Sequence, residues 1–161
     1  MISGGQTGAD QGGLFAARER RIDTGGTVPK GWKTETGPAP WLAKYGCVEA
    51  ATDRYPFRTE RNVVDSSGTL IFGDVNSPGS RLTIDFCRKH RKVWKVISPN
   101  RVFMNEREVY QRAISEVKSF LELYDVTTLN VAGNRESTNP GIGEFTKRVL
   151  LTVFPPYRRP H

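Results

Sequence analysis

Short apolar runs alternate with amphipathic segments along this chain, and this alternation constrains the fold more than any other feature. Three runs are rich in β-branched or aliphatic side chains and are bounded by Gly, Pro or Ser: residues 70–72, 93–97 and 129–132. Such runs are typical of strands buried on both faces of a parallel sheet. Because parallel strands need crossover connections, we expect helices between them.

Four segments have the apolar spacings of one, three and four residues that place side chains on one face of a helix. They are residues 10–21, 80–90, 106–124 and 142–153. Strands that alternate with helices predict an α/β fold, with an open, mostly parallel sheet and helices on both of its faces.

The length of 161 residues leaves room for one domain, which we place at residues 1–154. Residues 23–55 interrupt the alternation, because they are rich in Gly, Pro and Thr, and we expect a long, loop-rich excursion on the ligand side of the sheet. Residues 155–161 predict an extended C-terminal tail. Only residues 1–3 precede the first glycine turn, so we expect the parent protein to carry further N-terminal residues.

The charge balance favours an anionic partner. The chain has 24 Lys and Arg against 17 Asp and Glu, a formal net charge of +7. Nucleic acid, an acidic surface and a phosphorylated small molecule all fit such an excess. The cations are scattered, and two of their densest groups fall near expected helix ends, where they complement the helix dipole. We therefore do not expect nucleic acid to be the partner.

Targeting and cysteine patterns point to the cytoplasm. No apolar run approaches the roughly 18 residues of a membrane span, and the first residues do not form a secretory signal. Cys47 and Cys87 lie far apart, without a CxxC pair. We expect a cytoplasmic protein without membrane contact, disulfide framework, or zinc or other metal site.

The first expected strand is followed by a glycine-rich turn that suits an anion. Ligands of open α/β sheets bind beyond the carboxyl ends of the strands. Gly4, Gly5 and Gly8 let the backbone approach a ligand closely, Ser3 and Thr7 add hydroxyl groups, and the next helix offers unpaired N–H groups. The turn matches neither a Walker loop nor the GxGxxG spacing. The alternative is a tight turn with Asp10 as the N-cap.

Two further turns lie after expected strands. In residues 73–80, Pro78 and Gly79 shape the turn, and Ser80 either caps the helix or binds a phosphate oxygen. In residues 133–141, Arg135 can pair with an oxyanion or with Glu136, and a helix-start signal follows at Pro140. Three such turns at one sheet edge predict a composite anion site.

Matching segments across nearly the whole chain carry a family resemblance. In order they are residues 2–10 (ISGGQTGAD), 29–31, 58–66, 68–72, 79–80 with 83, 129–133, 135–137 and 140–141. The chain resembles the molybdenum carrier family, the molybdenum-cofactor carrier proteins. The resemblance implies a Rossmann-like domain related to the LOG cytokinin-activating phosphoribohydrolases. It also implies a homo-oligomer, expected to be a tetramer, that holds molybdenum cofactor or a related anion. Asn134 departs from the pattern, which has proline there, and this leaves the path of the third turn open.

The same relationship bears on catalysis. LOG enzymes carry a PGGxGTxxE motif whose glutamate acts in cleaving the N-glycosidic bond, and residues 77–83 correspond to it, with Thr83 at the glutamate position. A threonine hydroxyl cannot replace a carboxylate as an acid or base at neutral pH. We therefore predict binding without turnover. A LOG-type nucleotide phosphoribohydrolase and a nucleotide-binding sensor remain the alternatives.

Together, the turns and the resemblance predict the residues that contact the cargo, which is molybdenum cofactor (molybdopterin) or a molybdate-like oxoanion. They are Ser3, Gly4, Gly5, Gln6, Thr7, Gly8, Asp10, Lys30, Gly79, Ser80, Thr83, Gly133, Asn134, Arg135, Glu136 and Ser137. A molybdoenzyme is the expected acceptor. Two further contacts stay open: a thiol contact from Cys47 to molybdenum, and stacking of Trp32 or Trp41 on a pterin.

Overall fold

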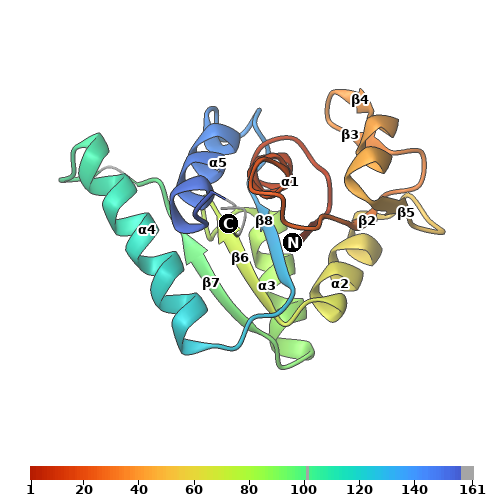
Figure 1. Cartoon of the computed structure of the whole chain (residues 1–161). Helices are drawn as coiled ribbons and strands as arrows, with labels where there is room; N and C mark the ends of the chain where they lie inside the picture. The colour runs from red at the N-terminus through yellow and green to blue at the C-terminus, as the bar shows by residue number, and fades with distance from the viewer. Residues whose placement is uncertain (101, 157–161) are drawn as a thin grey trace, which may run out of the picture.

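The computed structural model describes residues 1–100 and 102–156. Its main sheet has four parallel strands in the order β1 (Ile2–Ser3), β8 (Leu129–Gly133), β6 (Gly68–Phe72) and β7 (Val93–Ile97) (Figure 1). The three strands predicted from apolar runs are therefore confirmed, and so is the Rossmann-like α/β architecture. Residues 157–161, which make up most of the predicted tail, lie outside the described residues.

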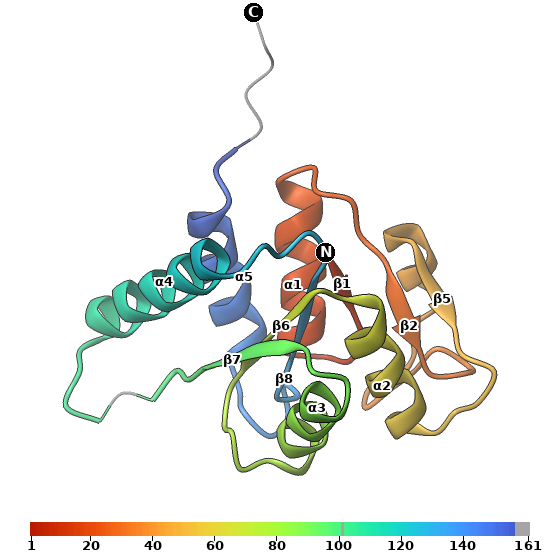
Figure 2. The ribbon, with the colours of Figure 1, turned by 90° about the horizontal axis from the view of Figure 1, so that it is seen from below.

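Helices cover both faces of this sheet, as Figure 2 shows from below. On one face lie α1 (Ala9–Glu19), α4 (Glu106–Leu123) and α5 (Ile142–Val153). On the other lie α2 (Tyr55–Asp65) and α3 (Pro78–Lys89). Four of these five helices match the predicted segments to within two residues.

The two faces of the sheet differ in chemistry because strand side chains alternate. Leu70, Phe72 and Val131 are fully buried in the main core together with residues of α4 and α5. The neighbouring strand positions, among them Thr69 and Asn130, lie on the opposite face, and the amide of Asn130 donates to the hydroxyl of Thr69 at 3.3 Å. The face under α2 and α3 is therefore partly polar.

The predicted excursion contains regular structure of its own. Within residues 23–55, β2 (Gly26–Val28) pairs with β5 (Cys47–Glu49) in parallel, and β3 (Lys33–Thr34) pairs with β4 (Gly37–Pro38) as a hairpin. The 3-10 helix η1 (Pro40–Tyr45) connects β4 to β5. Five buried residues form a second core here: Leu14, Val28, Ala39, Leu42 and Cys47. The excursion is thus a small folded layer beside β1 and α1.

Among the α-helices of the described residues, α2 is the one that the sequence did not predict. Only Asn62 and Val63 are buried in it, and one of these is polar, so the segment lacks the apolar stripe by which a helix is found. Pro56 in its first turn is compatible with a helix start. Its position between the excursion and α3 proves important for the site.

None of the helices in the described part of the chain combines the length and the apolar composition that crossing a bilayer requires.

A glycine allows α1 and α5 to pack closely, and this contact is testable. A Cβ on Gly12 would overlap the backbone carbonyl oxygen of Gly143, which cannot move without shifting α5. We expect Gly12→Ala to lower the free energy of unfolding by about 1–3 kcal/mol, the usual cost of overpacking. Urea denaturation followed by circular dichroism measures this.

The matched control is Gly79→Ala, since a Cβ on this helical glycine meets no atom within 4 Å. Its stability should equal or slightly exceed that of the unmodified protein, because alanine favours a helix more than glycine does. Equal losses in the two variants would contradict the packing explanation.

Candidate functional site

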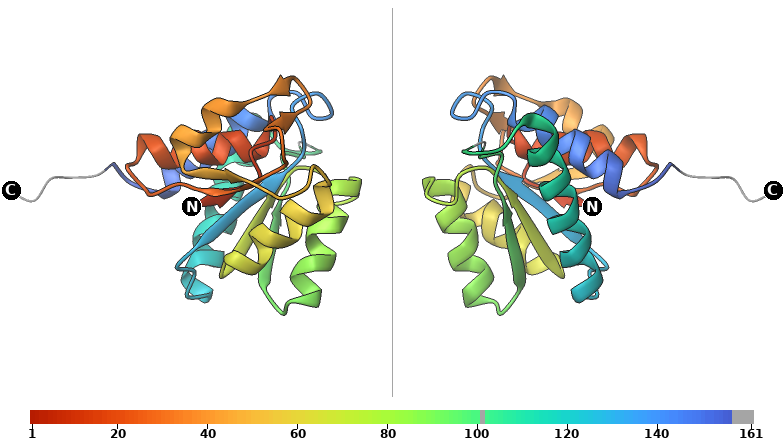
Figure 3. Two further views of the ribbon diagram at one scale, coloured as in Figure 1. Left: turned by 90° about the vertical axis from the view of Figure 1, so that its right-hand side faces the viewer. Right: turned by 90° about the vertical axis from the view of Figure 1, so that its left-hand side faces the viewer.

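The three predicted turns meet at one edge of the main sheet. Strands β1, β8 and β6 are parallel neighbours, so their carboxyl ends lie side by side and lead into α1, α5 and α3. Figure 3 shows these turns together at one end of the molecule. The prediction that the turns share an edge is therefore confirmed.

Asn134 joins these turns to one another. Its side-chain oxygen accepts from the backbone N–H of Asp74 at 2.7 Å, and its side-chain nitrogen donates to the Ser77 hydroxyl at 2.9 Å. Its backbone carbonyl accepts from the N–H of Ala9 at 3.1 Å. Asn134 is only 5% exposed. Asn134, which replaces the proline of the family pattern, thus links the three turns by hydrogen bonds.

The backbone amides of the glycine turn donate within the protein. The N–H of Gly5 donates to the Ser3 hydroxyl at 3.4 Å, and that of Gln6 donates to the Asp10 carboxylate at 3.2 Å. The N–H of Thr7 donates to the side chain of Gln6 at 3.0 Å. Gly8, not Asp10, is the N-cap residue of α1. Three amides of this turn, those of Gly5, Gln6 and Thr7, therefore already donate to side chains of residues 3–10.

The other two helix beginnings are satisfied in a similar way. Glu136 accepts from the N–H groups of Gly141 at 2.6 Å and Gly143 at 3.0 Å, so it stabilises the start of α5. At α3 the N-cap is Ser77, not Ser80, and its hydroxyl accepts from the Ser80 N–H at 3.2 Å. Side chains, both cations and hydroxyls, are therefore the main candidates to bind an anion at this edge.

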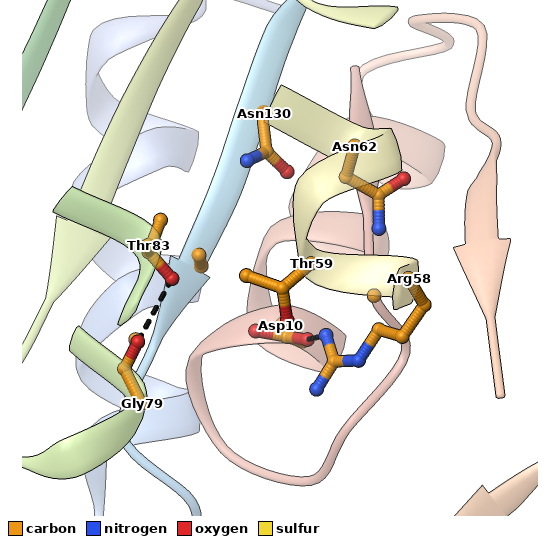
Figure 4. A pocket seen from close by; sticks show the side chains of 10 residues that line it. Asp10, Arg58, Thr59, Asn62, Gly79, Thr83 and Asn130 are labelled. Atoms are coloured by element: carbon orange, nitrogen blue, oxygen red, sulfur yellow. Dashed lines mark hydrogen bonds and ion pairs between the residues drawn. The ribbon is translucent and has the colours of Figure 1, made fainter. Parts of the chain in front are cut away.

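An inner cavity of about 50 Å³ lies between these turns and α2 (Figure 4). Its floor is an ion pair between Arg58 and Asp10, with 3.1 Å from Nη1 to Oδ2 and side chains 13% and 4% exposed. Burial raises the pKa of Asp10 above its ordinary value of 3.8, while the charge of Arg58 opposes that shift. The Nε of Arg58 is buried without a hydrogen-bond partner among the described residues.

The remaining walls of the inner cavity are polar. Thr83 donates its hydroxyl proton to the carbonyl oxygen of Gly79 at 2.9 Å (Figure 4). Asn62 bonds both backbone polar groups of Thr27, at 2.8 and 2.9 Å, and so ties α2 to β2. The lining residues are Gly4, Asp10, Arg58, Thr59, Asn62, Gly79, Thr83, Asn130, Ala132 and Gly133.

An outer cavity of about 430 Å³ continues from the inner one, because Arg58, Thr59, Gly79 and Gly133 line both. The guanidinium carbons of Arg58 and Arg135 lie 5.4 and 5.2 Å from the ring centre of Tyr55. Its other lining residues include Gln6, Ser77, Pro78, Leu82, Asn134 and Thr138. The outer cavity thus brings two cations, an aromatic ring and an apolar wall together.

The β3–β4 hairpin reaches over this edge from the excursion. The carboxylate of Glu35, at its turn, accepts from the hydroxyls of Thr7 and Ser137 and from the N–H of Ser137 at 3.1 Å. The N–H of Glu35 donates to the side chain of Gln6 at 2.9 Å. Figure 3 shows the hairpin, in orange, beside the blue loop after β8.

The predicted cargo-contacting residues divide into three groups. Eight line the two cavities: Gly4, Gln6, Asp10, Gly79, Thr83, Gly133, Asn134 and Arg135. Seven build the turns without lining either cavity: Ser3, Gly5, Thr7, Gly8, Ser80, Glu136 and Ser137. Lys30 is exposed and lines neither cavity.

Sequence reasoning missed the contributions of α2, of the hairpin and of the middle of β8. Tyr55, Arg58, Thr59 and Asn62 come from α2, Asn130 from β8 and Glu35 from the hairpin. The one available signal was a polar residue inside an otherwise apolar strand, at Asn130, because a buried amide needs a partner.

The thiol and the tryptophan rings that were considered as further cargo contacts lie away from the two cavities. Cys47 is buried in the second core, where its pKa is raised to about 11, first by desolvation and then by the charge of Asp10. Trp32 packs against that core, and Trp41 stacks on Phe15 with ring centres 5.9 Å apart. None of these side chains lines either cavity.

The hairpin contact predicts a pH dependence. Hydrogen bonds from Ser137 and then from Thr7 hold the pKa of Glu35 below its ordinary value of 4.5. A carboxyl group with a lowered folded-state pKa stabilises the folded protein above its unfolded pKa, and this stabilisation is lost as the pH falls through the lowered value. The hairpin contact should therefore persist at neutral pH and weaken below pH 4.5.

Carbon-13 NMR of the Glu35 carboxyl group measures this directly. The titration midpoint should lie below 4.5 and should rise when Ser137→Ala removes one donor. A midpoint at or above the ordinary value in the unmodified protein would contradict the contact.

Comparisons with known proteins agree with this architecture. The model of the circularly permutated YpsA SLOG family matches residues 1–154. Among solved structures, the chain is similar to a "putative molybdenum carrier protein" from Syntrophus aciditrophicus SB, with 38% identity and a TM-score of 0.83. That alignment covers 95% of this chain and 92% of the other. No curated protein matches the chain.

Proposed function

Because the chain belongs to the circularly permutated YpsA SLOG family, we propose that it is a carrier that binds a phosphate-bearing or oxoanion cargo, molybdenum cofactor in the first instance, without transforming it. The resemblance to molybdenum carriers noted in the sequence is confirmed by the 38% identical solved structure. The observation that carries the proposal is the pair of guanidinium groups, Arg58 and Arg135, in a cavity at the carboxyl ends of parallel strands.

The outer cavity suits a cofactor of this kind in size and chemistry. Its volume of about 430 Å³ falls in the range of small-molecule sites. Arg135 is exposed and can pair with a phosphate or oxo group through its planar fork. Open space beside Gly79 leaves room for that group near the start of α3. Tyr55 and Leu82 give a heterocyclic ring an apolar surface.

Binding without turnover follows from the residue at the position of the LOG glutamate. The hydroxyl of Thr83 is already engaged with the Gly79 carbonyl and does not ionise at neutral pH. It can contact a ligand, but it cannot supply the proton transfer that glycosidic cleavage needs.

The test is calorimetric titration of the protein with molybdenum cofactor, with molybdate and with nucleoside monophosphates. We expect saturable binding of the cofactor, and Arg135→Ala should weaken it about 10- to 100-fold, the range for losing a charge-assisted hydrogen bond. The matched control is Arg148→Ala. Arg148 also lies over a tyrosine ring, that of Tyr110 at 4.3 Å, but on α5, and it lines neither cavity.

Equal losses of affinity in the Arg135 and Arg148 variants would show that the ligand does not bind in the outer cavity. Failure of every probe to saturate would remove the carrier function.

A second candidate function is hydrolysis of a nucleotide, and one observation favours it. Asp10 supplies the inner cavity with a buried carboxylate whose pKa is raised by desolvation, on the wall shared with Thr83. An ionised carboxylate, which the ion pair with Arg58 maintains at Asp10, can serve as a general base. The carboxylate missing from position 83 is therefore matched by another one in the same cavity.

Incubation with AMP distinguishes the two candidates. The carrier function predicts no release of free base by chromatography. Release of base that Asp10→Asn abolishes while Thr83→Ala leaves it intact would establish the hydrolase instead. Release abolished by Thr83→Ala would show that the argument from threonine chemistry is wrong. Circular dichroism of both variants separates loss of activity from loss of fold.

We extend the proposal to assembly: the chain forms a homo-oligomer, a tetramer, that delivers its cargo to a molybdoenzyme in the cytoplasm. The support for this assembly is the family resemblance described above, which implies a homo-oligomer. Light scattering coupled to gel filtration gives the subunit number.

A further inference from the structure

The donors that converge on Glu35 have the composition of an oxyanion site. Two hydroxyls and one backbone N–H, from Thr7 and Ser137, point at a single carboxylate. They come from different turns, β1–α1 and β8–α5, 130 residues apart in sequence (137 − 7). Arg135 lies close enough for its positive charge to favour the ionised carboxylate. A phosphate or molybdate oxygen would find the same set of donors.

Hydrogen bonds hold the Glu35 carboxylate in this position. A Cβ on Gly37, beside the hairpin turn, would meet no atom within 4 Å, and one on Gly31 would meet only the Lys33 side chain. Both glycines and the intervening Trp32 have positive φ values of 81°, 55° and 106° in chain order. Trp32 and Ala39, which flank the hairpin, are anchored at the second core, whereas the turn between them has open space around Gly37.

We propose that Thr7 and Ser137 form an oxyanion subsite that Glu35 of the same chain occupies in competition with the anionic group of a ligand. The proposal deepens the function proposed above and rests on it for the identity of the natural ligand. The ligand class is a tetrahedral oxyanion, either free or as the phosphate of a cofactor. When it binds, the Glu35 carboxylate leaves and the β3–β4 hairpin swings away from the loop after β8.

A tethered competitor has a predictable effect on affinity. Glu35 is present at a high effective concentration, because its hairpin holds it beside the donors. If Glu35 fills the subsite about nine-tenths of the time or more, the apparent affinity of an external oxyanion is lowered about tenfold or more. Removing the carboxylate should restore that affinity, although it also removes three hydrogen bonds from the protein.

The first measurement is titration of the unmodified protein and of Glu35→Ala with inorganic phosphate and with molybdate. We expect the variant to bind at least one of them about tenfold more tightly or better. The added substitution Ser137→Ala should reduce that gain, because it removes a donor. An unchanged affinity in Glu35→Ala, or a gain that Ser137→Ala leaves untouched, would overturn the proposal.

Glu49→Ala is the matched control. Glu49 also anchors the hairpin region, by accepting from the N–H of Gly31 at 2.7 Å, but it contacts neither Thr7 nor Ser137 in any hydrogen bond of the described residues. It should leave the oxyanion affinity unchanged. A gain equal to that of Glu35→Ala would mean that loosening the hairpin, and not freeing the donors, raises affinity, which also overturns the proposal.

The second measurement is limited trypsin digestion after Lys33, which lies in β3. Saturating oxyanion should speed this cleavage in the unmodified protein, since the hairpin is displaced, and should not change it in Glu35→Ala, which is already released. Cleavage that is insensitive to oxyanion in the unmodified protein contradicts the displacement.

These experiments use inorganic anions, so they stand apart from the test of the carrier function. If Glu35→Ala binds phosphate more tightly but the protein does not bind molybdenum cofactor, the proposed cargo is wrong and the proposed subsite is supported. If the cofactor binds through Arg135 but Glu35→Ala does not raise the affinity for phosphate or molybdate, the carrier function is supported and the subsite is wrong.

Discussion

The buried ion pair between Asp10 and Arg58 is the interaction on which the site depends. It joins the first turn of α1 to α2, a helix that lies on the opposite face of the sheet. Such a pair is costly to bury, and removing one partner leaves an uncompensated charge in the interior. Arg58 crosses Gly4 so closely that a Cβ there would overlap its guanidinium group. A side chain at position 4 would therefore force the Arg58 guanidinium to shift from its place beside Asp10.

The three helix beginnings follow a common rule. At α5 and α3 a side chain of the protein accepts from the first N–H groups, namely the carboxylate of Glu136 and the hydroxyl of Ser77. At α1 the acceptors are backbone carbonyls, and the carboxylate of Asp10 accepts from Gln6 in the turn before the helix. Backbone N–H groups at a helix start need acceptors whether or not a ligand is present. A turn rich in glycine and hydroxyl residues therefore contains N–H groups that need hydrogen-bond acceptors, and other residues of the chain can supply them. Cations on neighbouring elements, here Arg58 and Arg135, then contribute to the recognition of an anion, together with the donors of Thr7 and Ser137.

Much of the fold could be predicted from the sequence, and the reason is periodicity. The strands at 68–72, 93–97 and 129–133 and the four amphipathic helices carry apolar patterns that only those elements satisfy. Helix α2 could not be found in this way, since its buried face includes Asn62 and Arg58, which are stabilised by Thr27 and Asp10 far away in the chain. The site was predicted only where it lies on turns. Tyr55, Arg58 and Glu35 reach it through tertiary contacts that no local pattern encodes. Asn134, which was expected to touch the cargo, lines the outer cavity and also bonds the turns together.

The second core has a consequence for motion. Its members, Leu14, Val28, Ala39, Leu42 and Cys47, form a cluster separate from the one under the main sheet, and four of the five belong to the excursion. A segment with its own small core can open as a cooperative unit at a free energy below that of global unfolding. Backbone amides of β2 and β5 should then exchange with solvent as one group, ahead of those of β6 and β8. The segment that carries Glu35 would then open with its own free energy, lower than the free energy of unfolding of the main sheet.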